Sequence, residues 1–128
     1  NNTAVGYNSL DHATTGANNT ATGMNSLTAN TTGGSNVAVG GSALGANTTA
    51  SNNVAVGNDA LAANTTGTNN VAVGMGALDA NTTANGNIAV GANSLGSNTT
   101  GASNIGIGHE ALGLTPQAYR TQRLVEVR

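Results

Sequence analysis

The fold is decided by the stretch covering residues 52–68, which reads NNVAVGNDALAANTTGT. The same pattern recurs along the 128-residue chain with a period of 17 residues and without insertions or deletions. Three columns of this pattern keep one residue type in all seven copies; they begin at Asn2, Gly6 and Leu10. Self-similarity at a fixed period indicates a repeat architecture, in which each copy is one structural unit that stacks on the next.

The residues of one copy argue against a helix and predict strand and turns. Gly, Asn and Thr are poor residues in helix interiors, and Val54-Ala55-Val56 alternates with the period of two that is typical of a strand. Asn and Gly favour the corners, where the backbone must adopt left-handed conformations. Seventeen residues suffice for two strands of about five residues and two turns.

We therefore predict an all-β protein, a parallel β-solenoid of seven 17-residue coils over residues 1–119. The coils begin at Asn2, Asn19, Asn36, Asn53, Asn70, Asn87 and Asn104 and are numbered 1 to 7 in that order. Residues 120–128 are expected to form a C-terminal arm or a closing strand.

A single coil cannot bury its own apolar face, so the core must form between stacked coils. We expect two valines or isoleucines and one leucine of each coil to point inward, where burial of each stabilises the fold. In the middle coils this predicted core ladder consists of Val37, Val39, Leu44, Val54, Val56, Leu61, Val71, Val73 and Leu78. A ladder of stacked asparagines at the turns is expected from Asn36, Asn53, Asn70, Asn87 and Asn104.

A second asparagine column precedes a pair of threonines in most coils. Because Asn-x-Thr is the acceptor motif for N-linked glycans, we interpret this column as a surface column of candidate glycan acceptors, although turn chemistry alone also explains asparagine there. Asn47 and Thr49 have the spacing of an ice-binding face, so a mixed Asn/Thr face is an alternative. The column consists of Asn30, Asn47, Asn64, Asn81 and Asn98.

The ionisable residues form no catalytic or metal-binding constellation within their columns. Asp11 and Asp79 share a column four coils apart, and Asp59 and Glu110 share another column three coils apart. At about 4.8 Å per coil, both pairs are too far apart to act as an acid and a base. The two histidines lie near opposite ends, whereas a metal site needs its ligands together. We expect no catalytic residue, no metal, no cofactor and no enzymatic activity.

Composition excludes several classes of partner. Only 6% of the residues are charged and the net charge is −2, so no basic field attracts nucleic acid. No apolar run approaches the roughly 20 residues of a membrane helix.

Cysteine is absent, so no disulfide framework is expected. The chain does not start with Met and shows no signal peptide, so we expect a processed protein or a fragment of a longer one.

The Asn-x-Ala-Val-Gly-x-x-Ala-Leu pattern, best seen in residues 2–10 and 53–61, resembles the YadA-like head repeats of trimeric autotransporter adhesins. It is still more similar to the Asn-Thr-Ala-Val-Gly repeats of phage tail-fibre-like and bacterial surface proteins. The resemblance covers about residues 1–112. It implies a left-handed parallel β-roll assembled as a parallel homotrimer, with a role in adhesion or as a fibre segment. The turn around the Asn-Thr-Thr-Gly sequence makes the repeat longer than is usual for the head repeats.

Three functional hypotheses follow. The first is an extracellular adhesive or fibre segment, on a cell surface or a virion, which forms a homotrimer and binds a host surface, matrix or glycan. The second is a filament subunit that stacks head to tail through its N-terminal coil and a C-terminal assembly arm. The third is an ice-binding solenoid. The residues proposed for the assembly arm are Arg120, Arg123, Leu124, Val125 and Val127.

Overall fold

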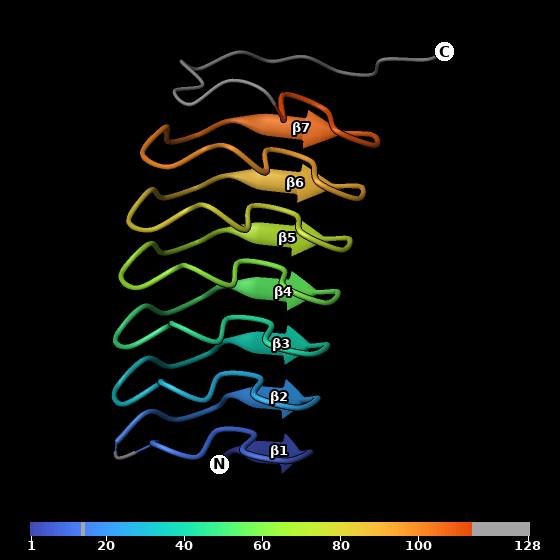
Figure 1. Cartoon of the computed structure of the whole chain (residues 1–128). Helices are drawn as coiled ribbons and strands as arrows, with labels where there is room; N and C mark the ends of the chain where they lie inside the picture. Colours follow the sequence, from blue (N-terminus) through green and yellow to red (C-terminus); the bar gives the residue numbers. More distant parts are fainter. Residues whose placement is uncertain (14, 114–128) are drawn as a thin grey trace.

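A computed structural model describes residues 1–13 and 15–113 and shows a rod of stacked coils (Figure 1). Seven parallel strands form one sheet in chain order, and no helix occurs within these residues. The all-β parallel solenoid predicted from the sequence is confirmed. The strands are β1 (Thr3–Val5), β2 (Thr20–Thr22), β3 (Val37–Val39), β4 (Val54–Val56), β5 (Val71–Val73), β6 (Ile88–Val90) and β7 (Ile105–Ile107).

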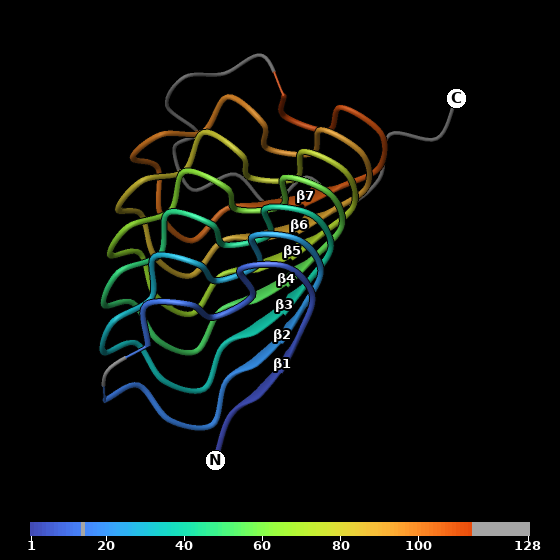
Figure 2. The ribbon, with the colours of Figure 1, turned by 60° about the horizontal axis from the view of Figure 1, so that its bottom comes forward.

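The coils stack in strict register. Val54, Ala55 and Val56 of β4 pair with the residues 17 positions later in β5, and every other neighbouring pair of strands follows the same rule. Seen obliquely from the end that carries the N-terminus, the outlines of successive coils follow one another closely (Figure 2). Because the repeat has no insertions, each column of the sequence becomes a straight row of side chains along the rod.

Within residues 1–13 and 15–113 each coil contains one strand of three residues, so the expectation of two longer strands per coil is wrong. The extended backbone ends after Val56 because Gly57 has a φ of 135°, and Asp59 and Leu61 follow with φ angles of 56° and 52°. Left-handed conformations turn the chain sharply, and they are costly for residues other than glycine and asparagine. The leucine column has this conformation in all seven coils, and hydrogen bonds between coils, such as Leu61 N–H to Ala77 C=O, hold it there.

The invariant glycine column marks a close approach between coils. Gly57 has a φ of 135°, and a Cβ atom added there would lie 2.5 Å from the carbonyl oxygen of Gly74 in the next coil. No side chain fits at that distance, so the invariant glycine is required for stacking as well as for its backbone conformation.

The core is narrow and consists mainly of alanine and leucine. Ala55, Ala60 and Leu61 are fully buried in coil 4, as are Leu44 and Leu78 in coils 3 and 5. The expectation that the valines of these coils also belong to the core is wrong, because they lie on the outer face. The valines concerned are Val37, Val39, Val54, Val56, Val71 and Val73.

The reason for this inversion is the size of the interior. Successive strand residues point to opposite sides, so either the valines or the alanine between them must face inward. At Gly106, the equivalent of these alanines in coil 7, an added Cβ would lie 2.7 Å from Ser94 Oγ and 3.0 Å from Leu95 Cγ. The column that faces inward can therefore hold only very small side chains, and the larger valines face outward.

Asparagine amides fill much of the remaining interior. Asn36, Asn53, Asn70, Asn87 and Asn104 are fully buried. The Oδ1 of Asn53 accepts the backbone N–H of Asn70 at 2.9 Å, while its Nδ2 donates to the Gly67 carbonyl of its own coil at 2.8 Å. The amides of Asn36, Asn53, Asn70 and Asn87 thus each link two coils and also close their own coil, which satisfies polar groups that would be costly to bury alone.

The arm over residues 120–128, with Arg120, Arg123, Leu124, Val125 and Val127, lies outside the described residues.

Candidate interaction surface

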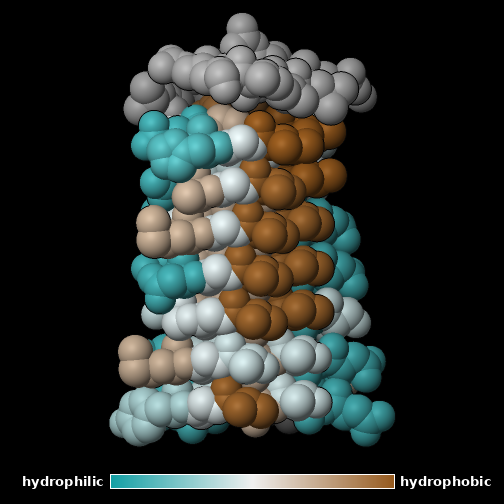
Figure 3. Space-filling model, turned by 90° about the vertical axis from the view of Figure 1, so that its right-hand side faces the viewer, coloured by the Kyte–Doolittle hydropathy of each residue, from teal (hydrophilic) through white to brown (hydrophobic). Residues whose placement is uncertain are grey.

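The outer face of the sheet carries a continuous row of exposed apolar side chains, which we call the Val/Ile stripe (Figure 3). Strand pairing places each member directly beside its equivalent in the next coil. Val39, Val56 and Val73 remain 36–37% exposed, a large fraction for apolar residues within a sheet. The stripe comprises Val37, Val39, Val54, Val56, Val71, Val73, Ile88, Val90, Ile105 and Ile107.

The first two coils break this apolar character. Coil 1 presents Thr3 and Val5 on the same face, and coil 2 presents Thr20 and Thr22. The register of the strands aligns Thr22 with Val5 on one side and with Val39 on the other. One end of the outer face is thus partly polar, whereas the five coils from β3 to β7 are apolar throughout.

A variable column lies two residues after the second stripe position. It includes Tyr7, Met24 and Met75, whose side chains are highly exposed. Other coils place Asn58 and His109 in the same column. Because neither the fold nor the stacking restricts these side chains, this column can vary without disturbing the rod.

The prediction that the candidate glycan acceptors form a surface column is wrong. Asn30, Asn47, Asn64, Asn81 and Asn98 are fully buried. The nitrogen that a glycan would modify is already occupied, because Asn64 Nδ2 donates to Asn47 Oδ1 and to Gly67 C=O, both at 3.0 Å. The column is instead a second internal amide ladder, and it meets the first ladder at the Gly67 carbonyl, which also accepts from Asn53.

The prediction of a mixed Asn/Thr ice-binding face is also wrong, because the side chain of Asn47 is buried inside the coil. Of each threonine pair in the middle coils, the first is half-buried and the second is exposed, as with Thr65 and Thr66. The Oγ1 of Thr65 donates to the Thr82 carbonyl at 3.1 Å, so the first threonine column supports stacking. Of the two threonine columns, only the second is exposed in these coils.

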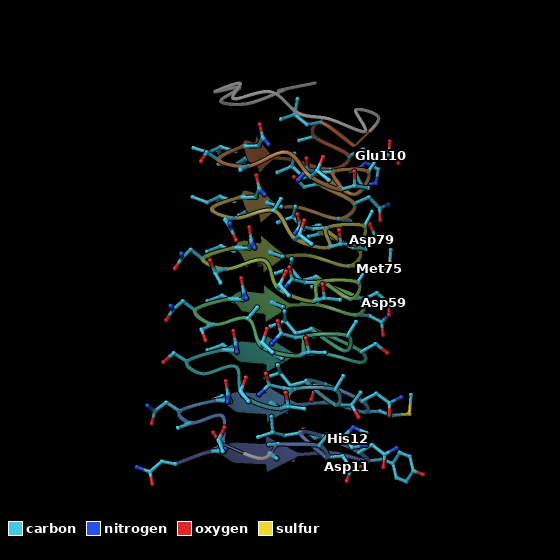
Figure 4. The ribbon with its side chains drawn as sticks, turned by 90° about the vertical axis from the view of Figure 1, so that its left-hand side faces the viewer. Asp11, His12, Asp59, Met75, Asp79 and Glu110 are labelled. Carbon is cyan, nitrogen blue, oxygen red and sulfur yellow. The ribbon has the colours of Figure 1, made fainter. Side chains whose placement is uncertain are left out.

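The ionisable side chains that the structure describes are spread along the rod (Figure 4). Asp11 lies 3.8 Å from His12, and His109 lies 3.9 Å from Glu110, in each case between exposed sequence neighbours. In the part of the chain that the structure describes, no three His, Cys, Asp or Glu side chains gather as a metal site would require. The same residues contain no helix with the length and apolar character needed to cross a membrane.

One grouping of carboxylates could not be found by comparing residues within columns. Asp79 and Glu110, which belong to different columns, line a surface hollow of about 260 Å³ together with Asn93 and Ser97. The hollow is open because Gly96 and Gly113 follow Asp79 in its own column. A search across neighbouring columns for glycines beside carboxylates would have found it.

Burial raises the pKa of the Asp79 carboxyl above its usual value. Hydrogen bonds from the backbone of Ala80 and of Asp79 itself lower the pKa in part, while the charge of Asp59 in the preceding coil adds to the increase. The carboxyl is partly desolvated and no ion pair is formed with it among the described residues, so its charged form is mildly unfavourable there.

Fold and surface together define the class: the protein is a parallel β-solenoid, a fold consistent with structural repeat proteins, with coils of 17 residues. Comparison with protein families, curated proteins and solved structures gave no match.

Proposed function

We propose that this protein is a non-enzymatic, extracellular structural segment of a surface adhesin or fibre, and that it works as an assembly of identical rods joined through the Val/Ile stripe. The observation that carries the proposal is the stripe itself. Monomeric soluble proteins rarely expose a long contiguous apolar surface, and such a surface is typical of an interaction site. Here it runs along five consecutive coils without an ionisable residue.

The most suitable partner for the stripe is a second copy of the chain. The side chains repeat along the rod at about 4.8 Å per coil. A partner can match every row only if it has the same spacing, and another copy has that spacing together with an equally long apolar face. The stripe is uncharged, so identical copies do not repel one another across it. These arguments support a homo-oligomer, and the resemblance to trimeric adhesin heads supports three chains.

Stiffness supports the structural role. Backbone bonds tie every coil to its neighbours, and in the middle coils two amide ladders and the threonine Oγ1 bonds add to them. Solenoids of this kind are stabilised mainly by contacts between neighbouring repeats, and they form straight, extended elements. The extracellular location and the adhesive role rest on the resemblance of residues 2–10 and 53–61 to surface and fibre repeats. The variable column beside the stripe is the surface on which contacts to a host surface, matrix or glycan would differ between coils.

The test is the mass of the protein in solution. We expect the parent chain to sediment as three chains at micromolar concentration. Replacing Val56 and Val73 by alanine removes four carbon atoms per chain from the interface and introduces no polar group. Each buried CH₂ contributes up to about 0.8 kcal/mol, so the double variant should dissociate about tenfold more readily.

The matched control is Thr49→Ser with Thr66→Ser, at two exposed threonines outside the stripe; its mass should equal that of the parent. Circular dichroism should show that all variants remain folded. A parent that stays monomeric over the whole concentration range would overturn the proposal, as would a double variant that assembles like the parent. Growth into long fibres by electron microscopy would favour the alternative of head-to-tail stacking.

A further inference from the structure

The regularity of the rod creates a problem for any assembly of copies. Because each coil repeats the previous one, two stripes that slide by one coil, about 4.8 Å, meet almost the same surface again. Reversing one rod also sets valine against valine along most of its length. A uniform apolar face therefore specifies association but neither register nor direction, as strands with uninformative faces slip in a sheet.

The only polar block in the described outer face lies at its N-terminal end. Coils 1 and 2 present Thr3, Thr20 and Thr22, whereas coils 3 to 7 present only valine and isoleucine. We infer that Thr20 and Thr22 fix the register and direction in which copies of this chain associate. The inference rests on the proposed self-association and adds to it the feature that selects one alignment.

The physical reason is the cost of an unpaired hydroxyl. With the rods parallel and in register, coil 2 faces coil 2, and the threonine hydroxyls of different copies can hydrogen-bond to one another. After a slip of one coil, Thr22 faces Val39 of the other copy. In an antiparallel pair with full overlap, coil 2 faces coil 6, and Thr20 and Thr22 meet Ile88 and Val90. Both alternatives bury hydroxyls against methyl groups, which leaves them without partners.

The same principle operates in coiled coils, where one buried polar residue in an apolar seam specifies register at some cost in stability. Thr20 and Thr22 are suited to this role because threonine has nearly the shape of valine and fits the same strand. They interrupt the stripe chemically without interrupting the sheet, since Thr20 and Thr22 pair with Val37 and Val39 in perfect register.

Cysteine cross-linking tests the inference directly, because the chain contains no cysteine of its own. Single variants Val39→Cys, Val56→Cys and Val73→Cys place one thiol in the stripe at coils 3, 4 and 5. Parallel in-register copies bring each thiol to its own equivalent, so each variant should form disulfides with itself. Mixtures of Val39→Cys and Val73→Cys should form no mixed disulfide, because about 10 Å along the rod separates the two positions.

The decisive comparison adds Thr20→Val and Thr22→Val to each cysteine variant. We expect association to persist but mixed disulfides between positions 39 and 56 to rise about tenfold, since slipped pairs no longer bury an unpaired hydroxyl. The matched control carries Thr49→Val and Thr66→Val outside the stripe, and its pattern of disulfides should equal that of the parent.

Each other outcome has one meaning. Disulfides of Val56→Cys with itself, together with mixed 39–73 links, would show an antiparallel assembly and overturn the inference while self-association stands. An unchanged pattern after the Thr20→Val and Thr22→Val substitutions would also overturn it. If no variant cross-links, not even Val56→Cys, which both directions bring together, the proposed self-association fails and this inference fails with it.

Discussion

The inside of one coil buries asparagine amides beside its alanine and leucine core, whereas the outer face of its strand exposes valines. Asn53 and Asn64 are fully buried, whereas Val54 and Val56 on the outer face reach solvent. The interior beside the strand is too narrow for valine, whereas the interior next to it suits flat amides that stack from coil to coil and hydrogen-bond along the stack. The difference teaches that the asparagines stabilise the single chain, while the valines are available for contacts with another molecule.

The largest expected effect comes from the inner side of this comparison. Asn53→Leu keeps roughly the volume of the side chain but leaves the Asn70 N–H unsatisfied, and it removes the bonds of Asn53 to the Gly67 carbonyl and to Asn70 Nδ2. An unsatisfied buried group costs about 1–3 kcal/mol and each lost bond about 0.5–1.5 kcal/mol, so we expect the free energy of unfolding to fall by about 2–6 kcal/mol in denaturant titrations. Asn58→Leu, at an exposed position, is the control and should change it by less than about 0.5 kcal/mol. Equal losses in the two variants would show that the buried ladder has no special role.

The next effect compares the apolar residues of the two sides. Leu61→Ala empties part of the thin core and should cost about 2–5 kcal/mol in dilute protein. Val56→Ala, on the outer face of the same coil, should cost less than about 1 kcal/mol, because the valine is already partly exposed. Thermal unfolding of both variants at low concentration measures the difference. A Val56→Ala loss as large as that of Leu61→Ala would contradict the assignment of the valines to the outer face.

The smallest effect concerns a carboxylate outside both regions. The pKa of Asp79 is raised in the folded protein, chiefly by burial. Its contribution to stability is therefore fully present below the pKa of the unfolded chain and is lost as the pH rises through the folded pKa. Asp79→Asn should stabilise the protein slightly at pH 7, by a few tenths of a kcal/mol since the group is largely solvated, and should make no difference near pH 3. Melting temperatures at the two pH values test this, and a destabilised variant at pH 7 would contradict it.

The sequence alone predicted the period, the parallel sheet and the register, because invariant Gly, Leu and Asn columns leave little freedom in how the coils stack. It could not decide which side of Val54-Ala55-Val56 faces inward. An alternating pattern assigns two residues to opposite faces without saying which face is buried, and the usual preference for large apolar residues inside fails when the interior is as narrow as it is beside Gly106. The prediction for the Asn64 column was wrong in the opposite sense, because residues expected on the surface are buried. Asn-Thr-Thr fits an exposed turn in sequence, yet the amide turns inward because Gly67 C=O and Asn47 Oδ1 accept from it.

The candidate surface was thus present in the sequence but assigned to the core. Because the valines lie on the outer face, Thr20 and Thr22 have a different role from the one they would have in a core. In a core they would weaken the packing, whereas on the outer face they are polar residues in an otherwise apolar row.

The strict register of the coils also determines which insertions and deletions in the gene the fold tolerates. An internal coil meets the same residues above and below, so a chain with one coil more or fewer keeps every ladder intact and changes only in length, by about 4.8 Å. An insertion of one residue, in contrast, displaces every later glycine, leucine and asparagine from its column. Recombination between repeats can therefore lengthen or shorten this rod by whole coils, so that one coil is the smallest unit in which its length changes.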